Sequence, residues 1–255
     1  MKVAAVQFAP LLKEPEKNLE TAVALVRQAA AGGAHLVVLP ELCLSGYSFM
    51  SSEEAGPFGE ILTRDPGVRK RSAGDGRSKS MDVLPSLAAE LGVAIAWGLI
   101  EEDPGTGHLY NAQILVLPTS EWVSYRKVNP FGNDFLWSKP GTGSPPIIKF
   151  MGKQIGLLIC ADVRDKSDNI GDFYEKGDAD IVAYSANWGD GGYPASKWMT
   201  FARDNGCTLV VSNRYGREEN NNFGEGGIGV IEPTGKVHCK GLLWSQPCVV
   251  YAEVP

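Results

Sequence analysis

Short apolar runs of strand length alternate with segments of helical periodicity along most of this chain. Lys2–Phe8 has the pattern of a strand. Glu16–Ala31 follows it with apolar residues on one helical face, and it ends at a pair of glycines. His35–Leu39 is a second apolar run and ends at a proline. This alternation predicts a layered α/β or α+β fold with mixed β-sheets.

The same pattern continues through the rest of the chain. Helices are predicted at Met81–Leu91 and at about residues 195–205. Further strands are predicted at Val93–Leu99, Leu109–Leu117, Trp122–Lys127, Ile147–Phe150, Lys153–Cys160, Ile181–Tyr184 and Thr208–Ser212. The tail is expected to form hairpin strands at Gly227–Ile231, Lys236–Lys240 and Cys248–Val254, with a turn at Pro233–Gly235.

Composition narrows the function classes. The chain has 255 residues, of which 44% are hydrophobic and 21% charged, as in ordinary globular proteins. Its net charge of −6 argues against general nucleic-acid binding, because phosphate contacts need a basic face. No apolar run approaches the roughly 18–20 residues of a membrane span. The first residues turn polar too early for a signal peptide. We therefore expect a cytoplasmic protein that binds neither nucleic acid nor membrane.

Five cysteines are spread along the chain without a CxxC pair, at Cys43, Cys160, Cys207, Cys239 and Cys248. Their odd number and wide spacing argue against a disulfide framework and against a zinc site. Cys160 differs from the others because it lies between the apolar run QIGLLI and the polar segment ADVRD. Such a position suits a nucleophile. The alternative is a buried structural cysteine, which is the interpretation that fits the other four.

Two charged residues also come at the ends of apolar runs. Glu41 directly follows HLVVLP, at a strand end where α/β folds place active sites. The alternative is a surface glutamate at a strand–loop junction. Lys127 ends the run WVSYRK, and a desolvated lysine there can stabilise an anion. The alternative is an ordinary edge-strand lysine.

Other patterns are less specific. The three histidines are spread through separate segments and none is near Cys160 in sequence, so a carboxylate is the expected base for a cysteine nucleophile. GEGGIG at 224–229 matches GxGxxG but precedes a strand, so we expect a flexible approach to a hairpin instead of a dinucleotide site. Residues 64–80 are rich in Arg, Lys, Gly and Ser. They are expected to be a solvated surface loop, with a basic binding patch as the alternative.

Three segments carry more information together than apart: LPELCLSGY around Glu41, YRKVNP around Lys127 and LLICADVRD around Cys160. Their order and spacing resemble those of the nitrilase or carbon–nitrogen hydrolase superfamily, which uses a Glu-Lys-Cys triad. Similar segments are KVAAVQFAP at the start, YNAQILVL at 110–117, Asn187-Trp188, WMTFARDN at 198–205 and GVIEPTGKV at 229–237. Because they span nearly the whole chain, they favour a single domain over residues 1–255.

The chain departs from the family pattern at three places. The family often has a second Glu after the lysine; here the nearest acid is Asp134, seven residues before Gly141, as the family Glu often is. The Arg-Phe-Pro-Glu that often follows the cysteine is here Arg-Asp-Lys-Ser at 164–167. Gly227 stands where the family often has Ser. These departures bear on substrate preference more than on the chemistry.

The resemblance implies a four-layer α-β-β-α sandwich with two mixed β-sheets. It implies a homodimer or higher homo-oligomer, and no metal or organic cofactor is expected. It also implies hydrolysis of a small-molecule amide through a thioester on Cys160, with Glu41 as general base. Lys127 and a backbone N–H at Ala161 would stabilise the oxyanion, and Asp134 would orient Lys127 or water. The residues expected to line or support the pocket are Tyr47, Phe131, Trp137, Asn187 and Trp188, with core packing as the alternative for the aromatic ones.

Three other functions stay open at this point. A nitrile or N-carbamoyl hydrolase would use the same triad. A binding or regulatory member of the family would have lost turnover, which the intact Glu41, Lys127 and Cys160 argue against. A thiol sensor would use oxidation of Cys160 as its function.

Overall fold

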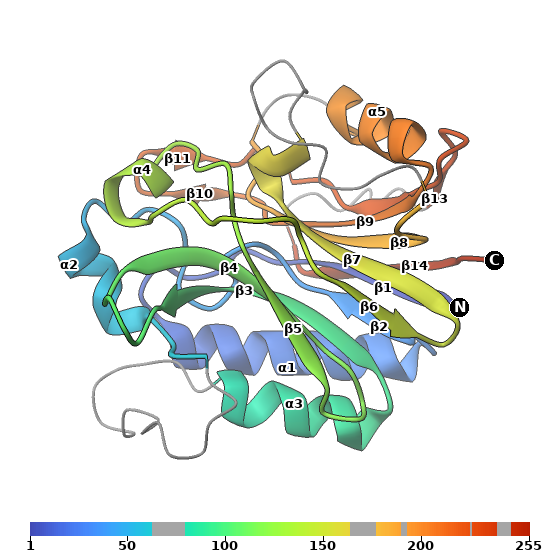
Figure 1. Ribbon diagram of the computed structural model, residues 1–255, viewed down its shortest axis with the longest axis horizontal. Coiled ribbons are helices and arrows are strands. Elements are labelled where there is room, and N and C mark those ends of the chain that lie inside the picture. The colour runs from blue at the N-terminus through green and yellow to red at the C-terminus, as the bar shows by residue number, and fades with distance from the viewer. Residues whose placement is uncertain (63–79, 164–176, 190–192, 225, 239–245) are drawn as a thin grey trace.

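Two six-stranded β-sheets lie face to face in the centre of the computed structural model, which describes residues 1–62, 80–163, 177–189, 193–224, 226–238 and 246–255 (Figure 1). The first sheet has the order β14-β1-β2-β3-β4-β5, with β1 (Lys2–Gln7), β2 (Leu36–Val38), β3 (Ala94–Glu102), β4 (Leu109–Val116), β5 (Trp122–Arg126) and β14 (Cys248–Glu253). The second has the order β13-β12-β9-β8-β7-β6, with β6 (Ile147–Phe150), β7 (Lys153–Ile159), β8 (Ile181–Ala186), β9 (Thr208–Asn213), β12 (Gly229–Ile231) and β13 (Val237–His238).

Both sheets are mixed, with parallel strands at the centre and antiparallel strands outside. In the first sheet β1, β2 and β3 are parallel, while β4, β5 and β14 join antiparallel. In the second sheet β7, β8 and β9 are parallel, while β6, β12 and β13 join antiparallel. The carboxyl ends of the central parallel strands are therefore the place to look for a site.

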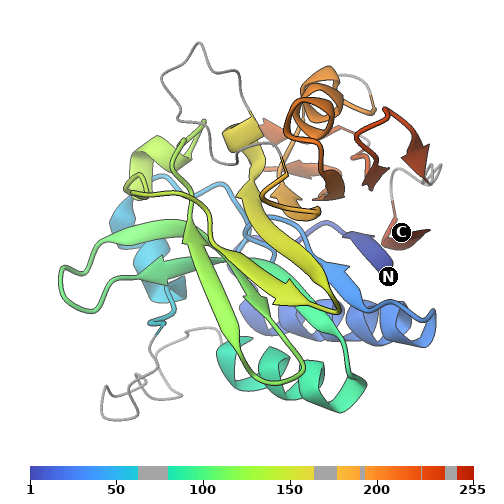
Figure 2. The same cartoon turned by 45° about the vertical axis from the view of Figure 1, so that its right-hand side comes forward.

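Helices cover the outer face of each sheet and complete the predicted four-layer α-β-β-α sandwich. α1 (Pro15–Ala31) and α3 (Ser80–Leu91) lie below the first sheet, and α5 (Ser196–Asn205) lies above the second (Figures 1 and 2). α1 begins with a proline in its first turn, where no backbone N–H is needed. α5 ends at Gly206, which takes the left-handed conformation.

Several short helices and strands lie in the loops between the longer elements. They are α2 (Ser52–Ala55), α4 (Asp134–Trp137), the 3-10 turns η1 (Gly56–Phe58) and η2 (Cys160–Val163), and the hairpin of β10 (Arg217–Glu218) with β11 (Asn221–Asn222). None of the helices in the described residues is both long and apolar enough to cross a membrane.

The first sheet buries apolar side chains on both of its faces. In β1, Val3 and Ala5 pack in the cluster between the two sheets, while Ala4 and Val6 pack in the cluster with α1 and α3. Side chains of a strand point alternately to opposite faces, so a run of small apolar residues is what a doubly covered strand requires. A serine also links the two sheets. Ser185 on β8 donates a hydrogen bond from its Oγ to the carbonyl oxygen of Leu39, which follows β2, at 2.7 Å.

The sequence predicted the main helices and strands, with shifts of one to three residues at most ends. The tail differs. β12 and β13 form the expected hairpin, but β14 leaves it and pairs antiparallel with β1 in the other sheet. The apolar pattern of β14 gives no indication of which sheet edge it will complete. Predictions for residues 64–79, 239 and 240 lie outside the described residues.

Candidate active site

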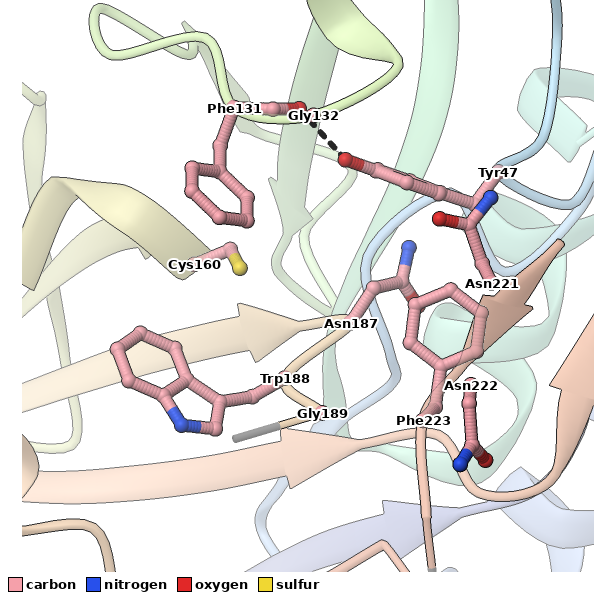
Figure 3. Close-up of a pocket in the computed structure, with 10 residues that line it drawn as sticks. All are labelled: Tyr47, Phe131, Gly132, Cys160, Asn187, Trp188, Gly189, Asn221, Asn222 and Phe223. Carbon is pink, nitrogen blue, oxygen red and sulfur yellow. Dashed lines mark hydrogen bonds between the residues drawn. The ribbon is translucent and has the colours of Figure 1, made fainter. Parts of the chain in front are cut away.

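Cys160 follows β7 directly and opens the turn η2. Its backbone φ is +41°, in the left-handed region that is strained for a residue with a side chain. Two buried side chains hold this turn. The hydroxyl of Tyr184 donates to the carbonyl oxygen of Cys160 at 2.9 Å, and Trp198 Nε1 donates to that hydroxyl at 3.0 Å. The thiol points into a pocket, where Figure 3 shows it opposite Asn187 and below the ring of Phe131.

Glu41 lies beyond the end of β2, and its side chain is fully buried. Its Oε1 accepts hydrogen bonds from Lys127 Nζ at 2.6 Å and from Asn111 Nδ2 at 2.7 Å. Its Oε2 accepts from the backbone N–H of Asn187 at 2.8 Å. The backbone of Glu41 lies so close to β3 that a Cβ at Gly98 would be 2.8 Å from its Cα, so a glycine is needed there.

Lys127 lies beyond β5, and its side chain is buried between two carboxylates. Besides Glu41, its Nζ donates to Asp134 Oδ2 at 2.7 Å. The short helix α4 begins at Asp134, whose Oδ1 accepts from Asn111 Nδ2 at 3.1 Å. Asn111 therefore bridges the same two carboxylates as the lysine. We call Glu41, Asn111, Lys127 and Asp134 the lysine cluster.

The environment sets the resting protonation of these groups. Burial raises the pKa of Glu41, and the charge of Lys127 offsets only part of this rise. Burial alone would lower the pKa of Lys127, but the charges of Asp134 and Glu41 outweigh it and raise this pKa well above its usual range. Burial and the charge of Glu41 raise the pKa of the Cys160 thiol. Cys160 therefore rests as a thiol beside a permanent ammonium and a carboxyl of increased basicity.

The pocket above Cys160 combines aromatic rings with carboxamides (Figure 3). Its lining residues are Tyr47, Phe131, Gly132, Cys160, Asn187, Trp188, Gly189, Asn221, Asn222 and Phe223. Tyr47 and Phe131 are joined because the Tyr47 hydroxyl donates to the carbonyl oxygen of Phe131 at 2.5 Å. The rings of Tyr47 and Phe223 meet edge to face at 5.6 Å. The pocket thus gives a small ligand an apolar enclosure with a few polar contacts.

A second buried ion pair, Arg214 with Glu218, lies behind the pocket wall that Tyr47 and Phe223 form. Arg214 Nη1 donates to Glu218 Oε2 at 2.7 Å, and the guanidinium stacks on the ring of Phe223 with 4.2 Å between its carbon and the ring centre. Glu218 Oε1 accepts from the backbone N–H groups of Tyr47 and Ser48, each at 2.7 Å. This pair, which we call the arginine pair, ties the segment after Glu41 to the β10–β11 hairpin.

Four of the five residues predicted to line or support the pocket do line it, and Trp137 does not. Tyr47, Phe131, Asn187 and Trp188 line the pocket with Cys160. Trp137 is buried among apolar side chains and packs edge-on to Phe49, because its place at the end of α4 turns it away from the pocket. Ala161 is buried in the turn after Cys160.

Several residues of this region were not predicted from the sequence. They are Asn111 of the lysine cluster, the arginine pair, and Asn221, Asn222 and Phe223 of the pocket wall. Asn111 lies in YNAQILVL, a segment that resembles the family, but the position of a polar residue in a strand does not show which carboxylate it will contact. Phe223 and its neighbours lie in a polar stretch without periodicity, where single-sequence patterns give little signal.

The other cysteines lack such surroundings. Cys43 and Cys207 are buried, and burial raises the pKa of each thiol to about 12. Cys248 is half-buried on β14, which corrects the expectation that it is fully buried, because it sits at the first position of an edge strand. Cys239 lies outside the described residues. Among the described residues, no group of three His, Cys, Asp or Glu side chains is placed to hold a metal ion.

The glycines of GEGGIG also have a structural explanation. A Cβ at Gly226 would lie 2.4 Å from Gln7 Oε1, and the backbone N–H of Gly227 donates to the same oxygen at 2.9 Å. Both glycines have positive φ. The segment precedes β12, as expected from its sequence context, and it meets Gln7 of the other sheet.

The model of the carbon-nitrogen hydrolase family matches residues 2–255. The chain belongs to the carbon-nitrogen hydrolase family. A nitrilase of Pyrococcus abyssi is 32% identical over 88% of this chain and 78% of that protein. An omega-amidase of Danio rerio is 28% identical over 93% of this chain and 82% of that protein. The crystal structure of an amidase from Nesterenkonia sp. has the same fold, with a TM-score of 0.80 and 23% identity, and covers 100% of this chain and 90% of that one.

Proposed function

We propose that this carbon-nitrogen hydrolase cleaves small carboxamides to a carboxylic acid and ammonia, with Cys160 as nucleophile. One observation carries the proposal: the buried thiol opens into a pocket next to a lysine that is bonded to two carboxylates, Glu41 at 2.6 Å and Asp134 at 2.7 Å. A base, a fixed cation and a nucleophile around a concave site are what acyl transfer requires.

In the first half-reaction Glu41 takes the proton of the Cys160 thiol while sulfur attacks the carbonyl carbon of the amide. The oxyanion that forms is stabilised by Lys127 Nζ and by the backbone N–H of Ala161, each contributing roughly 3–4 kcal/mol in comparable sites. Glu41 then gives the proton to the amide nitrogen. The carbon–nitrogen bond breaks, ammonia leaves, and a thioester on Cys160 remains.

The second half-reaction returns the enzyme to its starting state. Glu41 takes a proton from a water molecule, whose oxygen attacks the thioester carbon. Collapse of the tetrahedral intermediate breaks the carbon–sulfur bond and releases the acid, and Glu41 gives its proton to the sulfur of Cys160, which restores the thiol. Asp134 acts as a positioning residue, because its carboxylate holds Lys127 Nζ from the side opposite Glu41.

Relatives of the same fold support an amide substrate and a cysteine nucleophile. One structure of the amidase from Nesterenkonia sp. AN1 shows acrylamide added to the active-site cysteine, and another is a complex with butyramide. The relative named nitrilase favours a second candidate, nitrile hydrolysis on the same residues. Both candidates predict an acyl group on Cys160, so product analysis must separate them.

The test is an ammonia-release assay over short aliphatic amides, dicarboxylic ω-amides, carbamoyl amines and nitriles, with wild type and Cys160→Ala. We expect turnover of at least one carboxamide by wild type and none by the variant, with unchanged circular dichroism. Mass spectrometry of a quenched reaction should find the acyl group on the peptide that contains Cys160. Activity retained in Cys160→Ala, or no wild-type turnover of any carboxamide, would refute the proposal.

A further inference from the structure

Asn187 lines the pocket opposite the Cys160 thiol (Figure 3). It follows the end of β8, and its backbone N–H donates to Glu41 Oε2 at 2.8 Å. The carboxylate that this N–H contacts is the proposed base for Cys160. Because Asn187 and the Cys160 thiol line the same pocket, the Asn187 side chain can reach a ligand that Cys160 attacks.

The side-chain amide of Asn187 has no hydrogen-bond partner among the described residues, although the residue is only 8% exposed. Neither its Oδ1 nor its Nδ2 makes a hydrogen bond to them. Other carboxamides of the pocket are engaged: Asn221 Nδ2 donates to Ser48 Oγ at 2.8 Å, and Asn222 Oδ1 accepts from the backbone N–H of Gly224 at 3.1 Å. A buried amide with neither bond made is costly unless a ligand supplies the partners.

Figure 3 shows the Asn187 side chain directed into the space bounded by Cys160, Tyr47 and Phe131. Whichever way its amide is turned, it presents one acceptor and one donor group there. The complementary ligand must therefore carry an N–H donor and an oxygen acceptor close together. A primary carboxamide has both on one carbon atom.

We propose that Asn187 is a specificity-determining residue whose side chain hydrogen-bonds the scissile carboxamide, so that the site favours a primary carboxamide over the nitrile of the same acyl chain. Asn187 Oδ1 accepts from the substrate N–H, and Nδ2 donates to the substrate oxygen beside Lys127. This inference rests on the proposed amide hydrolysis and adds a substrate preference to it.

A nitrile fits this arrangement poorly. Its nitrogen is an acceptor without a hydrogen, so Asn187 Oδ1 stays buried and unpaired when a nitrile is bound. Sites built to hydrogen-bond a substrate N–H or O–H discriminate strongly against an analogue that lacks it, because the polar group of the site loses its partner. The same protein should therefore bind propionamide better than propionitrile.

The experiment compares kcat/KM for propionamide with that for propionitrile in wild type and in Asn187→Leu, which keeps the shape of the side chain without its polar atoms. If propionitrile is not turned over, its inhibition constant against propionamide replaces its kcat/KM. We expect the preference for the amide to fall by about 10–100-fold in the variant, mainly through loss of amide turnover. Phe223→Leu is the control, because it alters the pocket wall without removing a hydrogen bond and should change both substrates in proportion.

The outcomes separate this inference from the proposed function. A preference that changes less than about threefold in Asn187→Leu, or that falls equally in Phe223→Leu, overturns the role of Asn187 while amide hydrolysis by wild type still stands. No hydrolysis of any carboxamide by wild type overturns both. If Asn187→Leu does not fold, Asn187→Ser gives the same comparison, since it keeps a hydroxyl but no longer reaches the substrate amide.

Discussion

The lysine cluster and the arginine pair are both buried ion networks behind the same pocket, yet they use their charges differently. In the lysine cluster one cation binds two carboxylates, and the charges of Glu41 and Lys127 act on the Cys160 thiol. In the arginine pair the carboxylate of Glu218 is bonded to Arg214 and to backbone N–H groups of the pocket wall. Under the proposed mechanism, the lysine cluster takes part in the chemistry and the arginine pair holds the pocket wall in position.

The two networks differ in the groups that their carboxylates contact: a lysine beside Cys160 in one, and an arginine and backbone N–H groups in the other. Buried ion pairs gain little net stability, because desolvation cancels much of the attraction, but removal of one partner is costly. Both networks should therefore behave alike in unfolding experiments. If the proposed mechanism holds, substitutions in the lysine cluster should lower kcat, and substitutions in the arginine pair should mainly raise KM.

The largest expected effect is that of Lys127→Met on turnover. This substitution removes an oxyanion donor and leaves two buried carboxylates facing each other, so we expect kcat to fall at least about 10³-fold. Stability should fall by about 3–5 kcal/mol, since two carboxylates lose their cation. Stopped assays of ammonia release and urea unfolding measure the two quantities on the same preparation.

Arg214→Met is the matched control, because it removes the cation of the other network. A similar loss of stability is expected, with kcat reduced far less than in Lys127→Met. Arg214→Lys keeps the charge if the methionine variant does not fold. Equal losses of kcat in the lysine and arginine variants would show that the two networks do not have separate roles.

A smaller effect is expected for Glu218→Gln. The amide oxygen can still accept from the backbone of Tyr47 and Ser48, but the charge opposite Arg214 is lost. Because Glu218 then holds Tyr47 less firmly in the pocket, we expect KM to rise by about 3–10-fold and kcat to stay within about twofold of wild type. Steady-state kinetics with the best carboxamide test this; a change confined to kcat would place Glu218 in the chemical step instead.

The smallest expected effect concerns Asp162, a buried carboxyl that accepts hydrogen bonds from neutral groups. Asp162 accepts hydrogen bonds from Tyr125 and Asn129, and burial raises its pKa from 3.8 to about 7. Between pH 4 and 7 the folded state keeps a proton that the unfolded state has released. This contribution to stability is complete below pH 3.8 and is lost as the pH rises toward 7.

Asp162→Asn should therefore remove a decline in stability with rising pH. We expect the plot of unfolding free energy against pH, from urea titrations between pH 4 and 7, to slope less steeply downward in the variant than in wild type. Parallel curves would mean that Asp162 titrates alike in both states. Such a result would leave the lysine cluster as the main pH-dependent network near the pocket.

Sequence patterns predicted the layers and the three central residues. Glu41, Lys127 and Cys160 each follow the end of a strand, β2 and β5 in the first sheet and β7 in the second. The catalytic roles of these residues stay predictions, as do a single domain, a homodimer and a cytoplasmic location. Asp134 was also identified from its position, and the structure places its carboxylate on Lys127.

What the sequence by itself determined was the alternation of strands and helices and the covered faces of the sheets, because these depend on local periodicity. The positions of the candidate site residues came from the order of motifs that resemble the family. Only the tertiary structure decided which polar side chains are paired. It joined Asn111 to two carboxylates, Glu218 to the backbone of Tyr47, and left the amide of Asn187 without a partner among the described residues. Such pairings connect residues far apart in the chain, and no periodic pattern encodes the distance between them.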